Sequence, residues 1–339
     1  MLYLHHPSSL EHDPGAHVDE HPDTPERIRA IEAALATAQA GGLELDRRIA
    51  PLASRSDLEL VHDPALISRI ERLCLDGGGK IDADTAVGEV SYVAAQHAAG
   101  GACALAEALL GGEASTGFCG MRPAGHHADR DRAMGFCLFN NVAIAAEHAI
   151  RRLGAGRVMI VAWDVHHGNG TAEIFRSRDD VLFASIHQQG LYPGTGPITD
   201  AGSGAGLGFT INIPVPRGSG EDVWVSVLEH LIVPAGIEFS PDLVLISAGF
   251  DAHHADPLGG CRLESSSFAQ LACHVRELAA ITGAPAGAVL EGGYEPAALA
   301  ESVVATIAAL DGAGEAESIA PDPIVTGRAA AHIGHFWTL

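Results

Sequence analysis

The chain has 339 residues, 47% of them hydrophobic, a length that suits one large α/β domain or two smaller ones. Its 43 acidic residues outnumber its 20 basic residues, and the resulting net charge of −23 disfavours a nucleic-acid-binding protein. A field of this sign would attract cationic small molecules or lysine-rich peptides, although an acidic surface can also serve solubility alone.

Six cysteines are present and none forms a C-x-x-C pair, so we expect buried free thiols in a reducing compartment. The N-terminus lacks a basic region followed by a long apolar stretch. No uncharged apolar run of about 18 residues occurs, so no membrane-spanning segment is predicted. We therefore expect a cytoplasmic protein.

Apolar strand-like runs alternate with alanine-rich helical patterns along the chain. The Thr-Pro-Glu sequence at residues 24–26 predicts the start of a helix that ends near residue 40, before a glycine pair. Strands are predicted at residues 1–5, 115–119, 158–163, 181–187, 243–249 and 286–290. Further helices are predicted at residues 91–110, 140–153, 222–235, 264–282 and 296–310. Runs that are apolar on both faces predict one parallel sheet covered by helices on both sides.

Two predicted strands end in residues that can bind a metal. Asp164 and His166 follow the strand at 158–163, and Asp251 follows the strand at 243–249. Because ligands bind at the carboxyl ends of parallel strands, we expect these three side chains to lie together. One nitrogen and two carboxylate ligands suit a catalytic zinc ion with open positions, and iron(II) or cobalt(II) would also accept them. Taken alone, an Asp-x-His pair is more often a helix-capping aspartate beside an unrelated histidine.

Two more segments follow predicted strands. His126 and His127 are adjacent in a Gly- and Pro-containing loop, where one imidazole could take a proton from water and the other could protonate a leaving amine. Tyr294 follows a glycine pair, which permits close backbone approach, and its hydroxyl could donate to a developing oxyanion. Each segment alone would also fit an ordinary surface loop.

Six segments together resemble the histone deacetylase family, most closely its class II branch and bacterial relatives, which include acetylpolyamine amidohydrolases. They read RPAGHHA (122–128), GFCLFNN (135–141), WDVHHGNGT (163–171), YPGTG (192–196), SAGFDA (247–252) and LEGGY (290–294). The resemblance implies a single-domain arginase–deacetylase fold over residues 1–339, with a catalytic core at about 20–311. The Ala- and Gly-rich composition after Asp311 predicts a loosely packed C-terminal tail at 312–339. It also implies a parallel sheet of roughly eight strands with helices on both faces.

The resemblance also implies roles for single residues. It places zinc at Asp164, His166 and Asp251, and it makes His126 and His127 the family's histidine pair. In the family's mechanism, water activated by zinc attacks the acyl carbonyl, the histidine pair moves the protons with His127 as general base, and the tyrosine at position 294 stabilises the oxyanion.

The family's acyl-lysine tunnel maps onto four further positions. Gly135 and Phe136 match one wall, and the carbonyl of Gly135 would accept the substrate amide. Tyr192 stands opposite, where the family usually has phenylalanine. Leu258 stands where polyamine-specific relatives can carry an acid, so a broader acyl-amine pocket is expected.

One position departs from the family pattern. Ala162 stands where the family usually has an aspartate that orients the first histidine of the pair, so we expect His126 to lack its partner. In the family the same aspartate helps bind potassium, so Ala162 removes one expected contribution to the inner potassium site. The inner site would comprise Ala162, Asp164, His166, Ser185 and Ile186, and an outer site would comprise Phe175, Arg178 and Val181.

Three functions follow from these observations. The leading hypothesis is a zinc-dependent deacetylase for acetylated or short-acylated lysine side chains or related amines. The alternatives are an acetylpolyamine amidohydrolase, and a zinc-binding homologue whose activity Ala162 has lowered or abolished. Bacterial relatives often form dimers or tetramers, so a homo-oligomer is expected. No nucleic-acid or membrane partner is expected.

Overall fold

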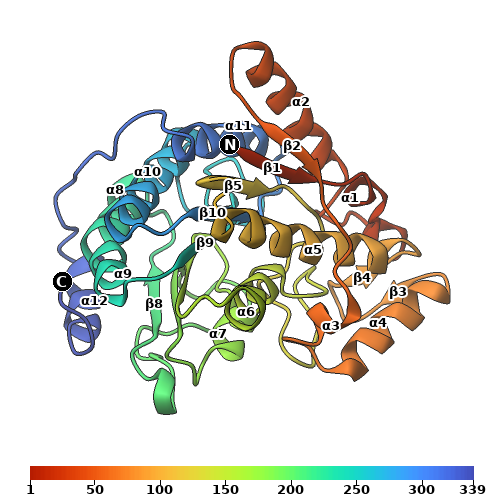
Figure 1. Ribbon diagram of the computed structural model, residues 1–339, viewed down its shortest axis with the longest axis horizontal. Coiled ribbons are helices and arrows are strands. Elements are labelled where there is room, and N and C mark those ends of the chain that lie inside the picture. The colour runs from red at the N-terminus through yellow and green to blue at the C-terminus, as the bar shows by residue number, and fades with distance from the viewer.

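A parallel sheet of eight strands forms the centre of the protein, as predicted (Figure 1). The computed structural model describes the whole chain, residues 1–339. The strand order is β2-β1-β5-β10-β9-β6-β7-β8, and all neighbouring strands are parallel. The strands are β1 (Leu2–His5), β2 (Asp46–Ile49), β5 (Thr116–Cys119), β6 (Val158–Ala162), β7 (Val181–Gln188), β8 (Thr210–Val215), β9 (Leu243–Ala248) and β10 (Ala286–Leu290). A small antiparallel hairpin, β3 (Gly79–Lys80) and β4 (Ala86–Val87), stands apart.

Helices cover both faces of the sheet (Figure 1). Helices α2 and α8 to α11 pack on one face, and α4, α5 and α6 pack on the other. The helices are α1 (Ser8–Glu11), α2 (Glu26–Ala40), α3 (Arg55–Leu58), α4 (Pro64–Leu75), α5 (Ser91–Leu110), α6 (Asn141–Leu153), α7 (Asn169–Ile174), α8 (Glu221–Val227), α9 (Val233–Phe239), α10 (Ser265–Thr282), α11 (Pro296–Leu310) and α12 (Val325–Ile333).

Strand β6 shows why the central strands are uninterrupted apolar runs in the sequence. Met159 and Val161 lie in the core beneath α2 and α8 to α11, whereas Val158, Ile160 and Ala162 lie in the core beneath α4, α5 and α6. Both faces of the strand are buried, so no polar alternation is required. The six predicted strands and the six predicted helical regions all occur.

The two edge strands were not predicted from the sequence. β2 reads Asp-Arg-Arg-Ile and is partly exposed along its length. β8 contains Pro214, which cannot donate a ladder hydrogen bond and is tolerated because β8 has a neighbour on one side only. β2 is mainly polar, whereas β8 buries Ile211, Ile213 and Val215 at alternate positions, so neither strand has the uninterrupted apolar run of the central strands.

Two predictions from the sequence, the helix at 222–235 and the loose tail at 312–339, need correction. The predicted helix at 222–235 is interrupted by a π-helical turn at Leu228–Ile232 between α8 and α9. The segment after Asp311 was expected to be a loose tail, but it contains α12, which packs against α8 and β8. Trp337 then donates its indole N–H to the carbonyl oxygen of Gly208 at 2.8 Å. The end of the chain is therefore packed on the edge of the sheet.

Four neighbouring central strands, β5, β10, β9 and β6, lead directly into the predicted site segments. The histidine pair follows β5, Tyr294 follows β10, Asp251 follows β9, and Asp164 follows β6. Because all four strands are parallel, their carboxyl ends bring these segments to one edge of the sheet. All six cysteines are buried and free, as predicted. None of the helices is long and apolar enough to span a membrane.

Candidate active site

Asp164, His166 and Asp251 lie together at the carboxyl ends of β6 and β9. Nδ1 of His166 is 3.0 Å from Oδ1 of Asp164 and 3.0 Å from Oδ2 of Asp251. All three residues are buried, and their ligand atoms lie within 4.8 Å of one another. The structure therefore brings together one imidazole nitrogen and two carboxylates, as predicted.

Backbone groups hold both carboxylates in place. The N–H groups of His166 and Gly292 donate to Asp164 at 2.9 and 2.8 Å, and the N–H of Val165 donates to Asp251 at 2.8 Å. A Cβ on Gly292 would lie 2.1 Å from Oδ2 of Asp251 and 2.6 Å from Oδ2 of Asp164. The glycine pair before Tyr294 thus lets the backbone approach the carboxylates closely, as the sequence predicted.

The electrostatics of this cluster fit a divalent cation. Burial disfavours a charged imidazole, but Asp251 and Asp164 outweigh burial and raise the pKa of His166 to about 10. Burial and the neighbouring Asp164 raise the pKa of Asp251 to about 7. Neither carboxylate forms an ion pair with a lysine or arginine. Two buried carboxylates and one imidazole, with no lysine or arginine paired to the carboxylates, form a donor set that suits zinc, iron(II) or cobalt(II).

The histidine pair lies beside this cluster, and its second member has a defined tautomer. Nδ1 of His127 is 2.7 Å from Oδ1 of Asn169, an amide oxygen that can only accept a hydrogen bond. Nδ1 therefore carries the proton and Nε2 has a free lone pair. Burial, followed by the neighbouring His126 and His166, holds the pKa of His127 well below 6.5.

His126 lacks the partner that His127 has. Its Nε2 is 3.9 Å from Oδ2 of Asp164, whereas its buried Nδ1 has no hydrogen-bond partner in the protein. Burial lowers the pKa of His126. The carboxylate of Glu291 is close by, but it accepts from the backbone N–H groups of Gly125 and His126 instead of from the ring. No acid replaces the one expected at Ala162, which is itself buried at the end of β6.

Tyr294 is anchored through its backbone and its ring. Its N–H donates to Oδ2 of Asp256 at 2.6 Å. The guanidinium carbon of Arg27 lies 4.8 Å from the centre of the tyrosine ring. Phe136 packs edge-on against the same ring, with 5.7 Å between the ring centres. Asp256, Arg27 and Phe136 therefore hold Tyr294 in place.

The predicted tunnel residues surround the same point. A Cβ on Gly135 would lie 2.5 Å from Cδ2 of His127 and 2.9 Å from Cε1 of Tyr192, so this position needs glycine. The ring of Tyr192 packs edge-on against His127, with ring centres 5.1 Å apart. Leu258 is half-buried in the loop of Asp256, to which its N–H donates at 2.9 Å.

The residues of the two candidate potassium sites lie around strands β6 and β7. Ser185 pairs in register with Ala162, Ile186 follows it, and Oγ of Ser185 is 2.9 Å from Nδ1 of His187. In the outer set, the N–H of Arg178 donates to the carbonyl oxygen of Phe175. The Arg178 side chain is engaged by Asp180 and Glu147. Val181 begins β7.

Comparison with known proteins shows the family to which this arrangement belongs. The histone deacetylase domain matches residues 21–310. The chain belongs to the histone deacetylase family. Membership supports an amidohydrolase activity of the deacetylase type, and the family is generally metal dependent.

Individual relatives match over most of this chain. A probable deacetylase of Methanothermobacter thermautotrophicus is 42% identical over 95% of this chain and 94% of its own length. A histone deacetylase-like amidohydrolase of Pseudomonas aeruginosa is 40% identical over 86% of this chain and 77% of its own. The human polyamine deacetylase HDAC10 is 39% identical over 85% of this chain and 44% of its own. The solved HDA15 HD domain superposes with a TM-score of 0.91 at 34% identity, covering 99% of this chain and 94% of that one.

The sequence did not reveal how this histone deacetylase domain supports its tyrosine. Arg27 donates to the carbonyl oxygens of Gly293 and Glu291 at 2.5 and 2.6 Å and to Asp23 at 2.6 Å. Arg122 donates to the same carboxylate at 2.6 Å. Burial opposes a charged Asp23, but Arg122 and Arg27 outweigh it and hold its pKa well below the usual range. The only signal was the Thr-Pro-Glu-Arg segment, which predicted a helix start.

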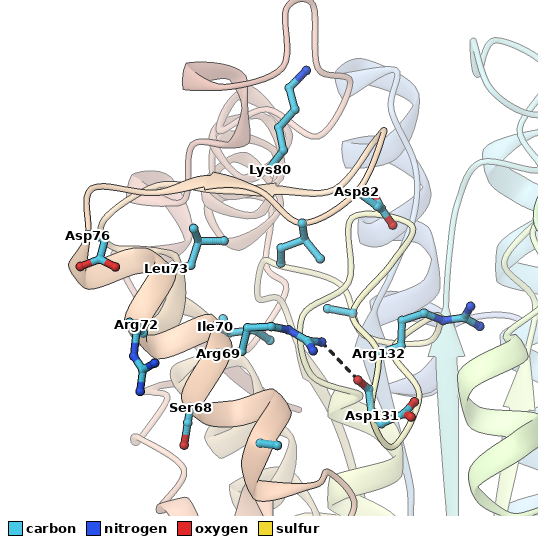
Figure 2. A pocket seen from close by; sticks show the side chains of 13 residues that line it. Ser68, Arg69, Ile70, Arg72, Leu73, Asp76, Lys80, Asp82, Asp131 and Arg132 are labelled. Atoms are coloured by element: carbon cyan, nitrogen blue, oxygen red, sulfur yellow. Dashed lines mark hydrogen bonds between the residues drawn. The ribbon is translucent and has the colours of Figure 1, made fainter.

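A separate hollow of about 940 Å³ lies between α4, the β3–β4 hairpin and the loop that carries Asp131 (Figure 2). Arg69 reaches the backbone oxygen of Asp131 at 3.2 Å, whereas Lys80 and Arg72 point away from each other. None of the predicted site residues lines this hollow. Its cationic groups do not converge, so it does not form an anion site.

Proposed function

We propose that the protein is a zinc-dependent amidohydrolase that removes acetyl or short acyl groups from lysine side chains or related amines. One observation carries this proposal. The donor cluster of Asp164, His166 and Asp251, the free Nε2 of His127 and the anchored Tyr294 all lie at the carboxyl ends of four adjacent strands. The family relationship supports the same class of reaction.

The residues of the site divide the work of amide hydrolysis. Bound at the Asp164, His166 and Asp251 cluster, zinc would supply a Lewis acid and acidify a water molecule. His127 would take the proton from that water at Nε2, because Nδ1 already donates to Asn169. The hydroxyl of Tyr294 would donate to the carbonyl oxygen as negative charge develops on it. A protonated histidine of the pair would then give its proton to the leaving amine.

The surrounding residues would position the acyl-amine chain. Gly135 would accept the substrate amide N–H at its carbonyl oxygen, and Phe136 and Tyr192 would form the tunnel walls, with Leu258 at the mouth. Potassium at the candidate inner and outer sites is part of the same proposal. A dimer or tetramer, and a cytoplasmic location, stay predictions from the sequence.

A fluorogenic acetyl-lysine assay on zinc-loaded protein tests the proposal. Wild-type protein should release the amine, while His127→Ala and Tyr294→Phe should lose most of the turnover. The exposed His332 on α12 offers a matched control, and His332→Ala should keep the wild-type rate. No turnover by zinc-loaded, folded wild-type protein on any acyl-lysine or acyl-amine substrate would overturn the proposal.

Acetylpolyamine hydrolysis is the second candidate. The net charge of −23 favours cationic substrates, and one relative is named a polyamine deacetylase. Leu258 provides no carboxylate for a second ammonium group. Rates on acetylputrescine, acetylspermidine and an acetyl-lysine peptide, measured side by side, separate the candidates. Equal rates on all three would exclude polyamine specificity.

The third candidate is a zinc-binding homologue with low activity, which the unpartnered Nδ1 of His126 favours. Restoring an acid with Ala162→Asp should raise kcat without changing the zinc content if the missing carboxylate limits the rate. An unchanged kcat in a folded, zinc-loaded Ala162→Asp protein would show that the missing carboxylate does not limit turnover.

A further inference from the structure

Two buried histidines outside the reacting groups contact the loop that carries Tyr192. Nδ1 of His167, in the loop between β6 and α7, is 2.8 Å from Oγ1 of Thr195. Nε2 of His187, near the end of β7, is 2.9 Å from the carbonyl oxygen of Gly196. Because a carbonyl oxygen only accepts, Nε2 of His187 donates, and its Nδ1 is left to pair with the hydroxyl of Ser185 at 2.9 Å.

The loop of residues 190–197 has few other hydrogen bonds to distant parts of the protein. Within residues 190–197, the remaining hydrogen bonds are to residues at most three positions away, such as the N–H of Gly194 to the carbonyl oxygen of Leu191. Gly190, Gly194 and Gly196 all have positive φ, so the backbone contains three residues of high conformational freedom. A hollow of about 390 Å³ separates part of this loop from residues 324–328 at the start of α12. His167 and His187 therefore supply the loop's hydrogen bonds to residues beyond its immediate neighbours, and Leu191 adds an apolar contact with the core.

Gly196 shows how closely the loop approaches both rings. A Cβ at this position would lie 2.5 Å from Cδ2 of His167 and 2.8 Å from Cε1 of His187. The two rings themselves are 4.7 Å apart between centres. The loop backbone thus lies directly against two imidazole rings, one from the loop between β6 and α7 and one from β7.

The same loop places Tyr192 in the candidate site. The tyrosine ring lies edge-on to His127 at 5.1 Å and to His166 at 6.4 Å between ring centres. A side chain on Gly135 would also meet it. A shift of the loop would therefore move the tunnel wall next to the histidine pair.

We propose that His167 and His187 are positioning residues that clamp residues 192–196, fix Tyr192 against the site, and thereby set substrate affinity and acyl-length preference. This inference rests on the proposed deacylase function for its kinetic consequence. Its structural part, a loop held by two histidines, can be measured without turnover.

Thr195→Val tests the clamp, because it removes the hydroxyl that pairs with His167 and keeps the side-chain shape. Thr195 is exposed, so the variant should fold. Amide hydrogen exchange of residues 190–197 in the zinc-loaded protein should become about tenfold faster, with no change at residues 252–260. KM for an acetyl-lysine peptide should rise about fivefold, and the preference between acetyl- and butyryl-lysine peptides should shrink, while zinc content stays the same.

Two further variants complete the experiment. Thr195→Ser keeps the hydroxyl and should restore wild-type exchange and KM. Thr199→Val removes a nearby exposed hydroxyl outside the clamp and should change neither. Unchanged exchange in Thr195→Val overturns the clamp, and faster exchange with unchanged KM and acyl preference overturns its role in the site. If wild-type protein hydrolyses no acyl-amine, the proposed function fails, whereas the exchange measurement still decides whether the clamp exists.

Discussion

Nδ1 of His127 donates to Oδ1 of Asn169 at 2.7 Å, and this contact decides which nitrogen of His127 can act as a base. The amide oxygen accepts a hydrogen bond from the N–H at Nδ1, so Nε2 of the neutral ring is left unprotonated. Asn169 is the first residue of α7, and His127 follows β5 in the adjacent loop. A contact between two residues 42 positions apart thus defines which ring nitrogen of His127 carries the proton.

The pH dependence of activity should follow from this pair. Burial and the neighbouring histidines hold the pKa of His127 well below 6.5, so the base stays neutral at neutral pH and activity falls only at lower pH. Asn169→Asp adds a carboxylate that stabilises the imidazolium and raises this pKa. The acidic limb of kcat/KM should therefore move up by about one to two pH units. An acidic limb that does not move in zinc-loaded Asn169→Asp protein would contradict the assignment of His127 as the base. Asn169→Ala should lower the rate without moving the acidic limb to higher pH.

Removing the hydroxyl of Tyr294 should affect turnover far more than binding. Tyr294→Phe keeps the ring between Arg27 and Phe136 and removes only the donor to the oxyanion. We expect kcat to fall on the order of 10²–10³-fold, with little change in KM or zinc content. Steady-state kinetics and metal analysis test this. A large rise in KM at unchanged kcat would show that the hydroxyl binds the ground state instead.

Gly292→Ala should disrupt the metal cluster directly. The added Cβ would lie 2.1 Å from Asp251 and 2.6 Å from Asp164, so at least one carboxylate must move. Zinc content after dialysis should fall well below that of wild type. Gly327→Ala is the matched control, because Gly327 lies in α12 with no neighbour within 4 Å of an added Cβ. That change should keep full zinc content and stabilise the helix by about 0.5–1 kcal/mol. Wild-type zinc binding by Gly292→Ala would contradict the close approach.

Arg27 should contribute to both stability and turnover. Arg27→Met would leave the carbonyl oxygens of Glu291 and Gly293 without their buried donor and would leave Asp23 with Arg122 as its only arginine partner. We expect the free energy of unfolding to fall by about 3–5 kcal/mol, measured by urea denaturation, and kcat to fall because Tyr294 loses its support. Arg29 lies on the same helix in an exposed ion pair with Glu26, so Arg29→Met should cost less than about 1 kcal/mol. Equal losses of unfolding free energy in Arg27→Met and Arg29→Met would argue against a stabilising role for the buried hydrogen bonds of Arg27.

The central strands could be predicted because an uninterrupted apolar run indicates a strand that is buried on both faces. β6 and β9 are apolar on both faces, and the residues after them are the ones that can bind a metal. The edge strands were not predicted, because β2 is polar, and β8 carries apolar residues at alternate positions only and contains Pro214. Helix α12 was missed because the alanine- and glycine-rich composition after Asp311 carried no clear periodicity.

The sequence by itself determined the α/β class, the order of the site segments and the residues that could bind zinc, because side-chain chemistry and hydrophobic periodicity are local properties. Only the tertiary structure decided that Arg27 and Asp23 support Tyr294, that no other acid replaces the missing partner of His126, and that His167 and His187 contact the loop of Tyr192. The contacts of Arg27 with Gly293 and Glu291, for example, join residues 266 and 264 positions apart. Strand order and loop closure create them, and neither can be read from local composition.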